Sequence, residues 1–332
     1  MKIGIELRQV TFGASGGLAQ HLQGVFAAAF RQYPEHQFFV FCTIFSRSII
    51  ENPSANVSVL TVPGFSFFSR IDQAFESGEI DILFRSYPME STLRMPWHKQ
   101  IAMIPDIQHE LYPEFFQPAI LSARTLAFNE ALARVGAVVT STDYVRRTIL
   151  AHPWTRCRDI FLAAPSLAAT WGNQGDLSPQ EQAKIPSEKF LLYPANLWPH
   201  KNHVRLLQAF ARLLESGQAA RLVLTGHPDG WEKLRDQFPG LPVTHLGFVR
   251  EPMLQALMAK AQALAFFSLH EGFGIPLLEA FAVRTPVICS NTTSLPEVGG
   301  DAVLSCDPTD VDAMQGLMRR ILADQDLRTV LI

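Results

Sequence analysis

The sequence predicts an α/β protein made of two Rossmann-like domains that face each other across a cleft. Short apolar runs alternate with amphipathic segments of helical period in both halves of the chain. Glycines stand between a strand and a helix at Gly16-Gly17 and again at Gly272 and Gly274. Between the halves, residues 165–187 are rich in turn-forming residues and have little apolar periodicity.

That middle stretch sets the expected domain boundaries. We assign residues 1–168 to an N-terminal domain, about 169–186 to a linker and 187–332 to a C-terminal domain. A chain of 332 residues is long enough for two domains of ordinary size.

Composition narrows the class of protein. Apolar residues make up 48% and charged residues 18%, which is typical of a folded protein with a large core. The net charge of −3 argues against a nucleic-acid-binding protein. The N-terminus has no signal peptide and no apolar run is long enough to span a membrane, so we expect a cytoplasmic protein. Free, buried thiols are expected at Cys42, Cys157, Cys289 and Cys306.

Strand and helix patterns cover most of the first half. Strands are predicted over residues 2–7, 38–43, 57–60, 80–84, 100–104 and 137–140, and helices from Gly16-Gly17 to about residue 31, over 120–135 and over 144–150. The spacing of Gly13, Gly16 and Gly17 does not give the G-x-G-x-x-G fingerprint, which argues against an NAD-dependent dehydrogenase.

The second half repeats the alternation. Strands are predicted over residues 189–193, 220–225, 243–246 and 263–267, and helices up to residue 215, over 252–260, from Pro276 onward and over 311–322. Asp310-Val311-Asp312 could hold a metal ion, but acidic residues also favour a helix start, and we prefer the second interpretation.

The most informative stretch follows the strand at residues 263–267. A polar loop ends at Glu271, Gly272-Phe273-Gly274 permits close approach of the backbone to a ligand, and Pro276 suits a first helical turn. Glu271 and Glu279 therefore flank one strand-to-helix turn. Parallel sheets bind ligands at such turns, and a helix N-terminus suits a phosphate or sugar oxygen.

This stretch also supports a family assignment. The segments E-G-F-G-I-P-L-L-E-A, P-V-I-C-S and S-L-P-E-V closely resemble the donor-sugar loop of retaining GT-B glycosyltransferases of family 4, the glycosyl transferases group 1. The resemblance implies a hexosyltransferase of polysaccharide biosynthesis. It would move mannose or glucose from a nucleotide-sugar to a hydroxyl of a glycan or lipid-linked saccharide, with retention and without a metal or other cofactor.

The resemblance also implies roles for residues of the second half. W-P-H-K-N-H is similar to the donor-phosphate loop, so Lys201 would neutralise the diphosphate, Glu271 would orient the sugar and Glu279 would bind the ribose. Asn196 stands where relatives carry an arginine, and Arg250 or Arg284 could replace that cation. Further donor contacts are implied for Gly16, Gly17, Gly226, Leu246, Val249, Phe273, Gly274, Ile275, Ser294 and Leu295.

The acceptor side is less well defined. Asp106 and His109 follow the strand at residues 100–104 and are candidate catalytic residues. Pro105 occupies the position of the histidine that many relatives place before the aspartate. Contact with a membrane could come from residues 65–68 (F-S-F-F) or 97–99 (W-H-K), although both also fit a core position.

Other functions fit the same pattern. An epimerase or a phosphorylase could use this fold, and Asn196, Pro105 and a short C-terminus are compatible with a sugar-nucleotide-binding protein that lacks transfer activity. Because relatives usually continue with a further helix, the resemblance suggests that the C-terminus is truncated.

Overall fold

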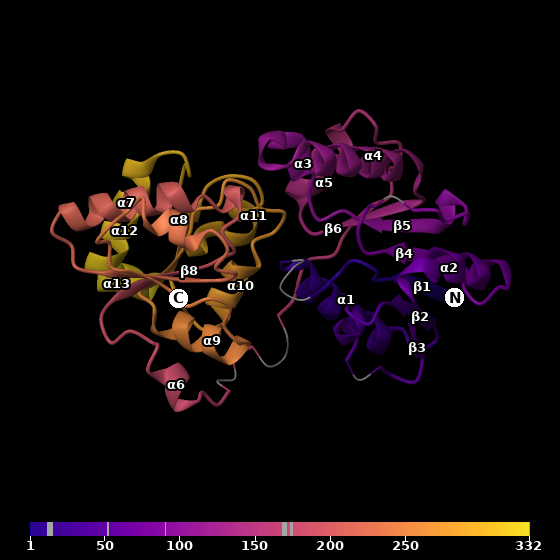
Figure 1. Cartoon of the computed structure of the whole chain (residues 1–332), viewed down its shortest axis with the longest axis horizontal. Helices are drawn as coiled ribbons and strands as arrows, with labels where there is room; N and C mark the ends of the chain where they lie inside the picture. Colours follow the sequence, from indigo (N-terminus) through magenta and orange to yellow (C-terminus); the bar gives the residue numbers. More distant parts are fainter. Residues whose placement is uncertain (12–15, 52, 90, 168–170, 173–174, 332) are drawn as a thin grey trace. The chain divides into compact units, whose positions relative to one another are not determined.

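The computed structural model describes residues 1–11, 16–51, 53–89, 91–167, 171–172 and 175–331 (Figure 1). The chain divides into two compact units, residues 1–168 and residues 169–332. The segment that we assigned to the linker falls within the second unit, and its described part contains a short helix, α6 (Pro179–Gln182). Gly13 lies outside the described residues.

The first unit is built on a seven-stranded parallel sheet with the order β3-β2-β1-β4-β5-β6-β7. The strands are β1 (Lys2–Glu6), β2 (Gln37–Cys42), β3 (Val57–Thr61), β4 (Ile82–Arg85), β5 (Gln100–Met103), β6 (Ala137–Thr140) and β7 (Ile160–Leu162). The direction of strand order reverses between β1 and β4, so their carboxyl ends flank a topological switch point.

Helices cover both faces of this sheet. They are α1 (Leu18–Gln32), α2 (Phe67–Glu76), α3 (Gln108–Leu111), α4 (Pro118–Arg134) and α5 (Asp143–Ala151). Ile5 and Val40 pack against α1 on one face of the sheet. Leu83 packs against α2 and Ala102 packs against α4. Because side chains alternate along a strand, α2 and α4 cover the face opposite to α1.

The second unit has a six-stranded parallel sheet with the order β10-β9-β8-β11-β12-β13. The strands are β8 (Phe190–Pro194), β9 (Arg221–Thr225), β10 (Val243–His245), β11 (Ala263–Phe266), β12 (Val287–Ser290) and β13 (Val303–Cys306). The strand order reverses between β8 and β11, which are direct neighbours. The switch point of this unit therefore lies at the carboxyl ends of these two strands.

Helices also flank the second sheet. They are α7 (His203–Glu215), α8 (Trp231–Arg235), α9 (Glu251–Lys260), α10 (Ile275–Ala282), α11 (Leu295–Gly299), α12 (Val311–Ala323) and α13 (Gln325–Val330). Figure 1 shows α7 and α12 above β8, with α9 and α10 below it. Short 3₁₀ turns occupy Arg47–Ile49, Gly64–Ser66, Trp97–Lys99, Pro113–Phe115, Pro199–Lys201 and Gly300–Ala302.

Two helices begin at side-chain caps. Thr142 caps α5 by accepting the backbone N–H of Val145, and Asp310 caps α12 by accepting that of Ala313. Asp310 therefore marks a helix start, as we preferred over a metal motif. The four cysteines are buried and free. Among the described residues, no helix is long and apolar enough to span a membrane.

Gly136 follows α4, where a glycine often ends a helix with a positive φ, but it does not adopt that conformation. A Cβ at Gly136 would clash with the backbone oxygen of His98. Close approach of two backbone segments, rather than left-handed geometry, therefore requires glycine here.

Candidate active site

The candidate site of the second unit lies at its switch point. The loop after β8 continues into the turn Pro199–Lys201, and the loop after β11 carries Glu271 and leads into α10. Because β8 and β11 are parallel neighbours, both loops leave the same edge of the sheet. Residues 70 positions apart in sequence thus meet at one place.

Lys201 and Glu271 form an ion pair at this edge. The Lys201 Nζ atom lies 2.6 Å from Glu271 Oε1, and the two side chains are only 13% and 12% exposed. The ammonium also lies 5.2 Å from the centre of the Phe266 ring, within cation–π range. The pair therefore presents one fixed positive and one fixed negative charge in a partly desolvated position.

Hydrogen bonds hold the two loops together. The backbone N–H of Leu269 donates to the His200 carbonyl at 2.7 Å, and Asn202 Nδ2 donates to the Phe267 carbonyl at 3.0 Å. The Tyr193 hydroxyl donates to the Lys201 carbonyl at 2.5 Å. Burial raises the pKa of Tyr193 well above its ordinary value, so this donor keeps its proton. Nothing in the sequence pattern singled out Tyr193 for this supporting role.

A third loop, before α11, fixes the Glu271 backbone. Thr293 Oγ1 accepts the Glu271 N–H at 3.2 Å, and Ser294 Oγ lies 2.9 Å from the Glu271 carbonyl and 3.0 Å from the Phe273 carbonyl. Ser294 is completely buried, and its hydroxyl hydrogen is shared between these two acceptors. In this arrangement Ser294 stabilises the loop and is not free to donate to a diphosphate, contrary to the expected role.

The start of α10 depends on Gly274. Its φ of +101° suits glycine, and an added Cβ would lie 2.5 Å from Leu295 Cδ2. Ile275 begins the helix, and Glu279 lies five residues into it, buried. The helix thus begins beside Glu271, with its free backbone N–H groups at the carboxyl edge of the sheet.

The loops after β9 and β10 complete this edge. Gly226 has a φ of +126°, and a Cβ there would lie 2.7 Å from the Ala195 carbonyl oxygen. Leu246 and Val249 are half-buried against the core. The exposed side chain is Phe248, at 67%, whose ring lies 5.9 Å from that of His227. Sequence reasoning named the flanking apolar residues and missed this aromatic pair.

Asn196 has a structural partner. Its Oδ1 accepts the backbone N–H of His227 at 2.9 Å, which ties the loop after β8 to the loop after β9. The structure gives both proposed replacements for the missing arginine other surroundings. Arg250 makes a two-bond contact with Glu181, at 3.0 and 2.7 Å, and Arg284 follows the far end of α10, about 12 Å from its start.

The predicted residues of the first unit lie at the carboxyl ends of its own strands. Gly16 has a φ of +55° and Gly17 is the N-cap of α1. Asp106 Oδ1 accepts the backbone N–H of Gln108 at 3.0 Å. The side chain of His109 is fully buried, and burial, followed by the charge of Arg124, lowers its pKa to about 4. His109 is therefore neutral and cannot touch a substrate in this conformation.

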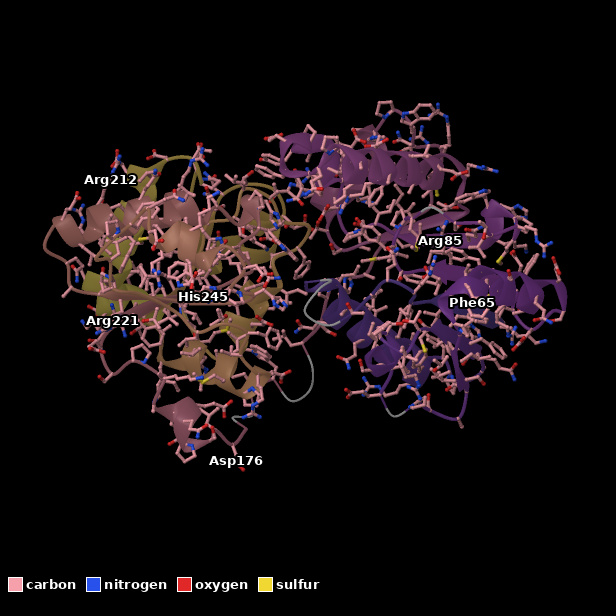
Figure 2. All side chains as sticks on the ribbon, in the orientation of Figure 1. Phe65, Arg85, Asp176, Arg212, Arg221 and His245 are labelled. Atoms are coloured by element: carbon pink, nitrogen blue, oxygen red, sulfur yellow. The ribbon has the colours of Figure 1, made fainter. Side chains whose placement is uncertain are left out.

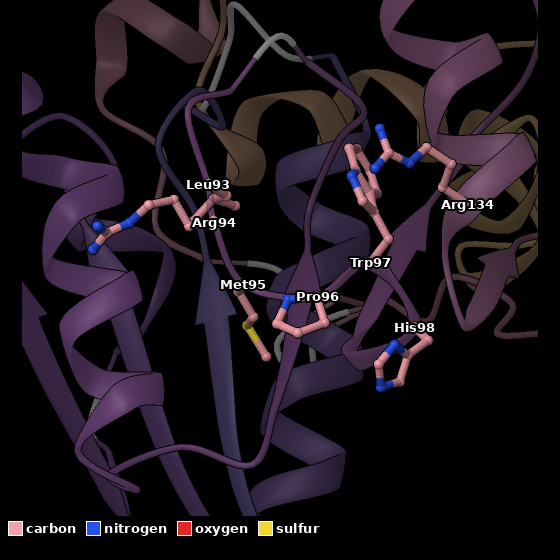
Figure 3. A pocket seen from close by; sticks show the side chains of 7 residues that line it. All are labelled: Leu93, Arg94, Met95, Pro96, Trp97, His98 and Arg134. Carbon is pink, nitrogen blue, oxygen red and sulfur yellow. The ribbon is translucent and has the colours of Figure 1, made fainter.

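A surface pocket of the first unit lies away from these residues (Figure 3). It is lined by Leu93, Arg94, Met95, Pro96, Trp97, His98 and Arg134. Trp97 precedes β5 and Arg134 ends α4, so the pocket lies at the amino edge of the sheet. Arg94 and Arg134 pair with Glu76 and Glu130, both at 2.9 Å or less, which neutralises much of its charge.

The whole chain is similar to solved glycosyltransferases. WaaG, described as a glycosyltransferase involved in lipopolysaccharide biosynthesis, aligns with a TM-score of 0.73 and 17% identity over 99% of this chain and 92% of that one. Anabaena Alr3699/HepE in complex with UDP-glucose aligns with a TM-score of 0.72 and 19% identity over 100% and 92%. The two doubly wound units thus have the fold of GT-B glycosyltransferases, and the second carries the Lys201–Glu271 pair.

Sequence comparison adds similarities to named proteins. Residues 176–332 match the model of the glycosyl transferases group 1. Over 236 residues the chain is 32% identical to the O-antigen chain mannosyltransferase B of Escherichia coli, covering 68% of this chain and 61% of that protein. Over 139 residues it is 30% identical to a GDP-mannose-dependent alpha-(1-6)-phosphatidylinositol dimannoside mannosyltransferase of Mycobacterium tuberculosis, covering 42% and 36%. The chain thus spans about three fifths or less of these relatives.

Proposed function

We propose that this protein is a retaining hexosyltransferase that moves mannose from a nucleotide-sugar to a hydroxyl of a growing glycan without a metal ion. The observation that supports this proposal is the Lys201–Glu271 ion pair, whose charged atoms lie 2.6 Å apart. The pair lies at the carboxyl ends of β8 and β11, beside the start of α10. A diphosphate leaving group develops negative charge during transfer. An ammonium group and helix N–H groups can stabilise that charge in place of a divalent cation.

The proposal assigns a separate role to each of three residues. Lys201 binds the diphosphate, Glu271 orients the sugar hydroxyls near the oxocarbenium-like centre, and Glu279 accepts hydrogen bonds from the ribose. The acceptor attacks from the face that the diphosphate leaves, and a phosphate oxygen takes the proton of the acceptor hydroxyl. This route accounts for retention and requires no enzymic nucleophile.

The names of relatives support mannose as the transferred sugar. The two relatives described above are named as mannosyltransferases, and one is named as GDP-mannose-dependent. We therefore propose GDP-mannose as the donor and a polysaccharide or glycolipid as the acceptor.

A second function has one observation in its favour. The Asn196 side chain is neutral and accepts a hydrogen bond from the His227 backbone, so it supplies no positive charge to a diphosphate. A protein with only one cationic side chain at the diphosphate could bind a sugar nucleotide without transferring its sugar. An epimerase or phosphorylase would differ from both by acting without a glycan acceptor.

Thermal unfolding with a ligand panel tests the proposal. The panel contains GDP-mannose, UDP-glucose, UDP-GlcNAc, ADP-glucose and NAD, each with and without EDTA. We expect GDP-mannose to raise the melting temperature, because a ligand that binds only the folded state stabilises it by mass action. The EDTA samples should show the same shift. Absence of a shift with every sugar nucleotide would contradict the proposal. Conversion of the sugar nucleotide without added glycan would favour an epimerase, and binding without turnover would favour a binding protein.

We further propose that the enzyme works in the cytoplasm at the inner face of a membrane. Ile44 and Phe45 follow β2 and are each 74% exposed, and Phe65 follows the neighbouring β3 and is 93% exposed (Figure 2). Phe67 and Phe68 of the same apolar run are buried in α2. Trp97 lies at the opposite, amino edge of the sheet, so it cannot share one flat interface with Phe65.

Vesicle co-sedimentation tests the membrane contact. The full chain should pellet with vesicles of phosphatidylglycerol and phosphatidylethanolamine, and the Phe45→Ser/Phe65→Ser variant should pellet several-fold less, because it exposes less apolar area to the bilayer. A Val330→Ser variant is the matched control, since Val330 is 80% exposed but lies in the second unit. Equal pelleting of all three proteins would contradict this contact.

A further inference from the structure

A cluster of polar side chains in the first unit has buried hydrogen-bonding groups with no partner in the part of the chain that the structure describes. Tyr87 follows β4, Asp106 and His109 follow β5, and Arg124 lies on α4. Since β4 and β5 are parallel neighbours, these residues gather at the carboxyl edge of the sheet. The cluster belongs to the first unit, whereas Lys201 and Glu271 belong to the second.

Phe128 of α4 connects the members of this cluster. Its ring centre lies 5.3 Å from that of Tyr87 and 4.5 Å from that of His109, and the guanidinium carbon of Arg124 lies 5.5 Å from it. The Tyr87 hydroxyl, both ring nitrogens of His109 and Arg124 Nε are buried and have no hydrogen-bond partner among the described residues. Buried polar groups without partners are uncommon in native proteins and call for an explanation.

Arg124 is the most unusual member. Its guanidinium lies over the rings of Tyr87, Phe116 and Phe128, at 5.4, 4.9 and 5.5 Å. The structure gives it no hydrogen bond and no ion pair with any described residue. Its terminal nitrogens, unlike Nε, are not among the buried atoms that lack a partner, and the Arg124 side chain as a whole is half-buried. Three aromatic faces hold the guanidinium, and none of them satisfies its in-plane N–H donors.

Asp106 supplies a nearby acceptor. Burial has the largest effect on the pKa values of Tyr87 and His109. In addition, the charge of Arg124 lowers both pKa values and the charge of Asp106 raises both. Both charges therefore lie close to the same two side chains. They do not pair with each other, since the Asp106 carboxylate bonds to the Gln108 N–H and no contact within 4.0 Å joins it to Arg124.

We propose that Arg124 and Asp106 bind two neighbouring hydroxyls of the saccharide acceptor. One hydroxyl oxygen would accept from the guanidinium of Arg124, and the adjacent hydroxyl would donate to the carboxylate of Asp106. A donor and an acceptor held apart beside aromatic rings suit a neutral polyol better than a simple anion, which Asp106 and Glu110 would repel. Phe128, which packs against His109, would help to position Arg124. This inference rests on the proposed transferase function and assigns part of its acceptor site.

Side-chain NMR of the full chain tests this site directly. The probe is methyl α-D-mannopyranoside, and the readout is the Nε–H signal of Arg124, which burial should protect from exchange. The signal is assigned by its loss in Arg124→Lys. We expect a saturable shift in the wild type, and an apparent Kd about fivefold weaker or more in Asp106→Asn, which loses the charged acceptor.

Controls separate this site from general effects. Arg134→Lys changes another arginine of α4, which already pairs with Glu130, and should leave the titration unchanged. A signal that does not move, that moves equally with glycerol, or that is insensitive to Asp106→Asn would overturn the inference. The donor-induced melting shift is measured on the same proteins. A retained donor shift with no Arg124 response would leave the proposed function standing and remove only this site.

Discussion

The Lys201→Met variant is expected to bind GDP about one to two orders of magnitude more weakly than the wild type. The substitution keeps an unbranched apolar side chain and removes the ammonium, whose nitrogen lies 5.2 Å from the centre of the Phe266 ring. A hydrogen bond to a charged group contributes about 1.5–3 kcal/mol, which corresponds to that loss of affinity. Isothermal titration of the full chain with GDP measures it directly.

Two controls accompany this prediction. Lys189 precedes β8 whereas Lys201 follows it, so Lys189→Met removes the same charge at the opposite edge of the sheet and should leave the Kd unchanged. Lys201→Met should also unfold at a lower temperature, because the Glu271 carboxylate would remain largely buried without its partner. Equal GDP affinity in both variants would remove Lys201 from the donor site.

The elements of the fold were largely readable from the sequence, but their order in the sheets was not. The apolar run of β11 is buried on both faces and was predicted as a strand. β7, β12 and β13 were not predicted as strands, and β7 has only three residues, two of which are exposed. The reversal of strand order between β8 and β11 depends on long-range packing that no local pattern records.

The sequence predicted which residues belong to the candidate site, but the contacts between them became known only from the structure. The glycines and Pro276 predicted the turn around Glu271, and Gly274 does take a positive φ there. The pairing of Glu271 with Lys201 follows only from the adjacency of their strands. The hydrogen bonds that occupy Asn196 and Ser294 could not be foreseen either, because both partners come from distant loops.

The Glu271→Gln variant should lose transfer activity and yet bind GDP more tightly. In the unliganded protein the Glu271 carboxylate holds the Lys201 ammonium at 2.6 Å, so it competes with a diphosphate for the same cation and repels its charge. Glutamine removes the competitor and keeps the side-chain shape. We expect GDP affinity to rise several-fold, while the transfer rate falls by about 10²–10³, as when a preorganised electrostatic group is lost.

Glu279→Gln provides the contrast that makes this prediction specific. If Glu279 accepts hydrogen bonds from the ribose, its neutral form should bind GDP about tenfold more weakly, so the two Glu→Gln changes should move the Kd in opposite directions. Titration with GDP and with GMP separates the effects further. The gain in Glu271→Gln should shrink for GMP, which carries less phosphate charge, whereas the loss in Glu279→Gln should persist because the ribose is retained. A weaker GDP complex in Glu271→Gln would mean that the Lys201–Glu271 pair organises the phosphate site instead of competing with the ligand.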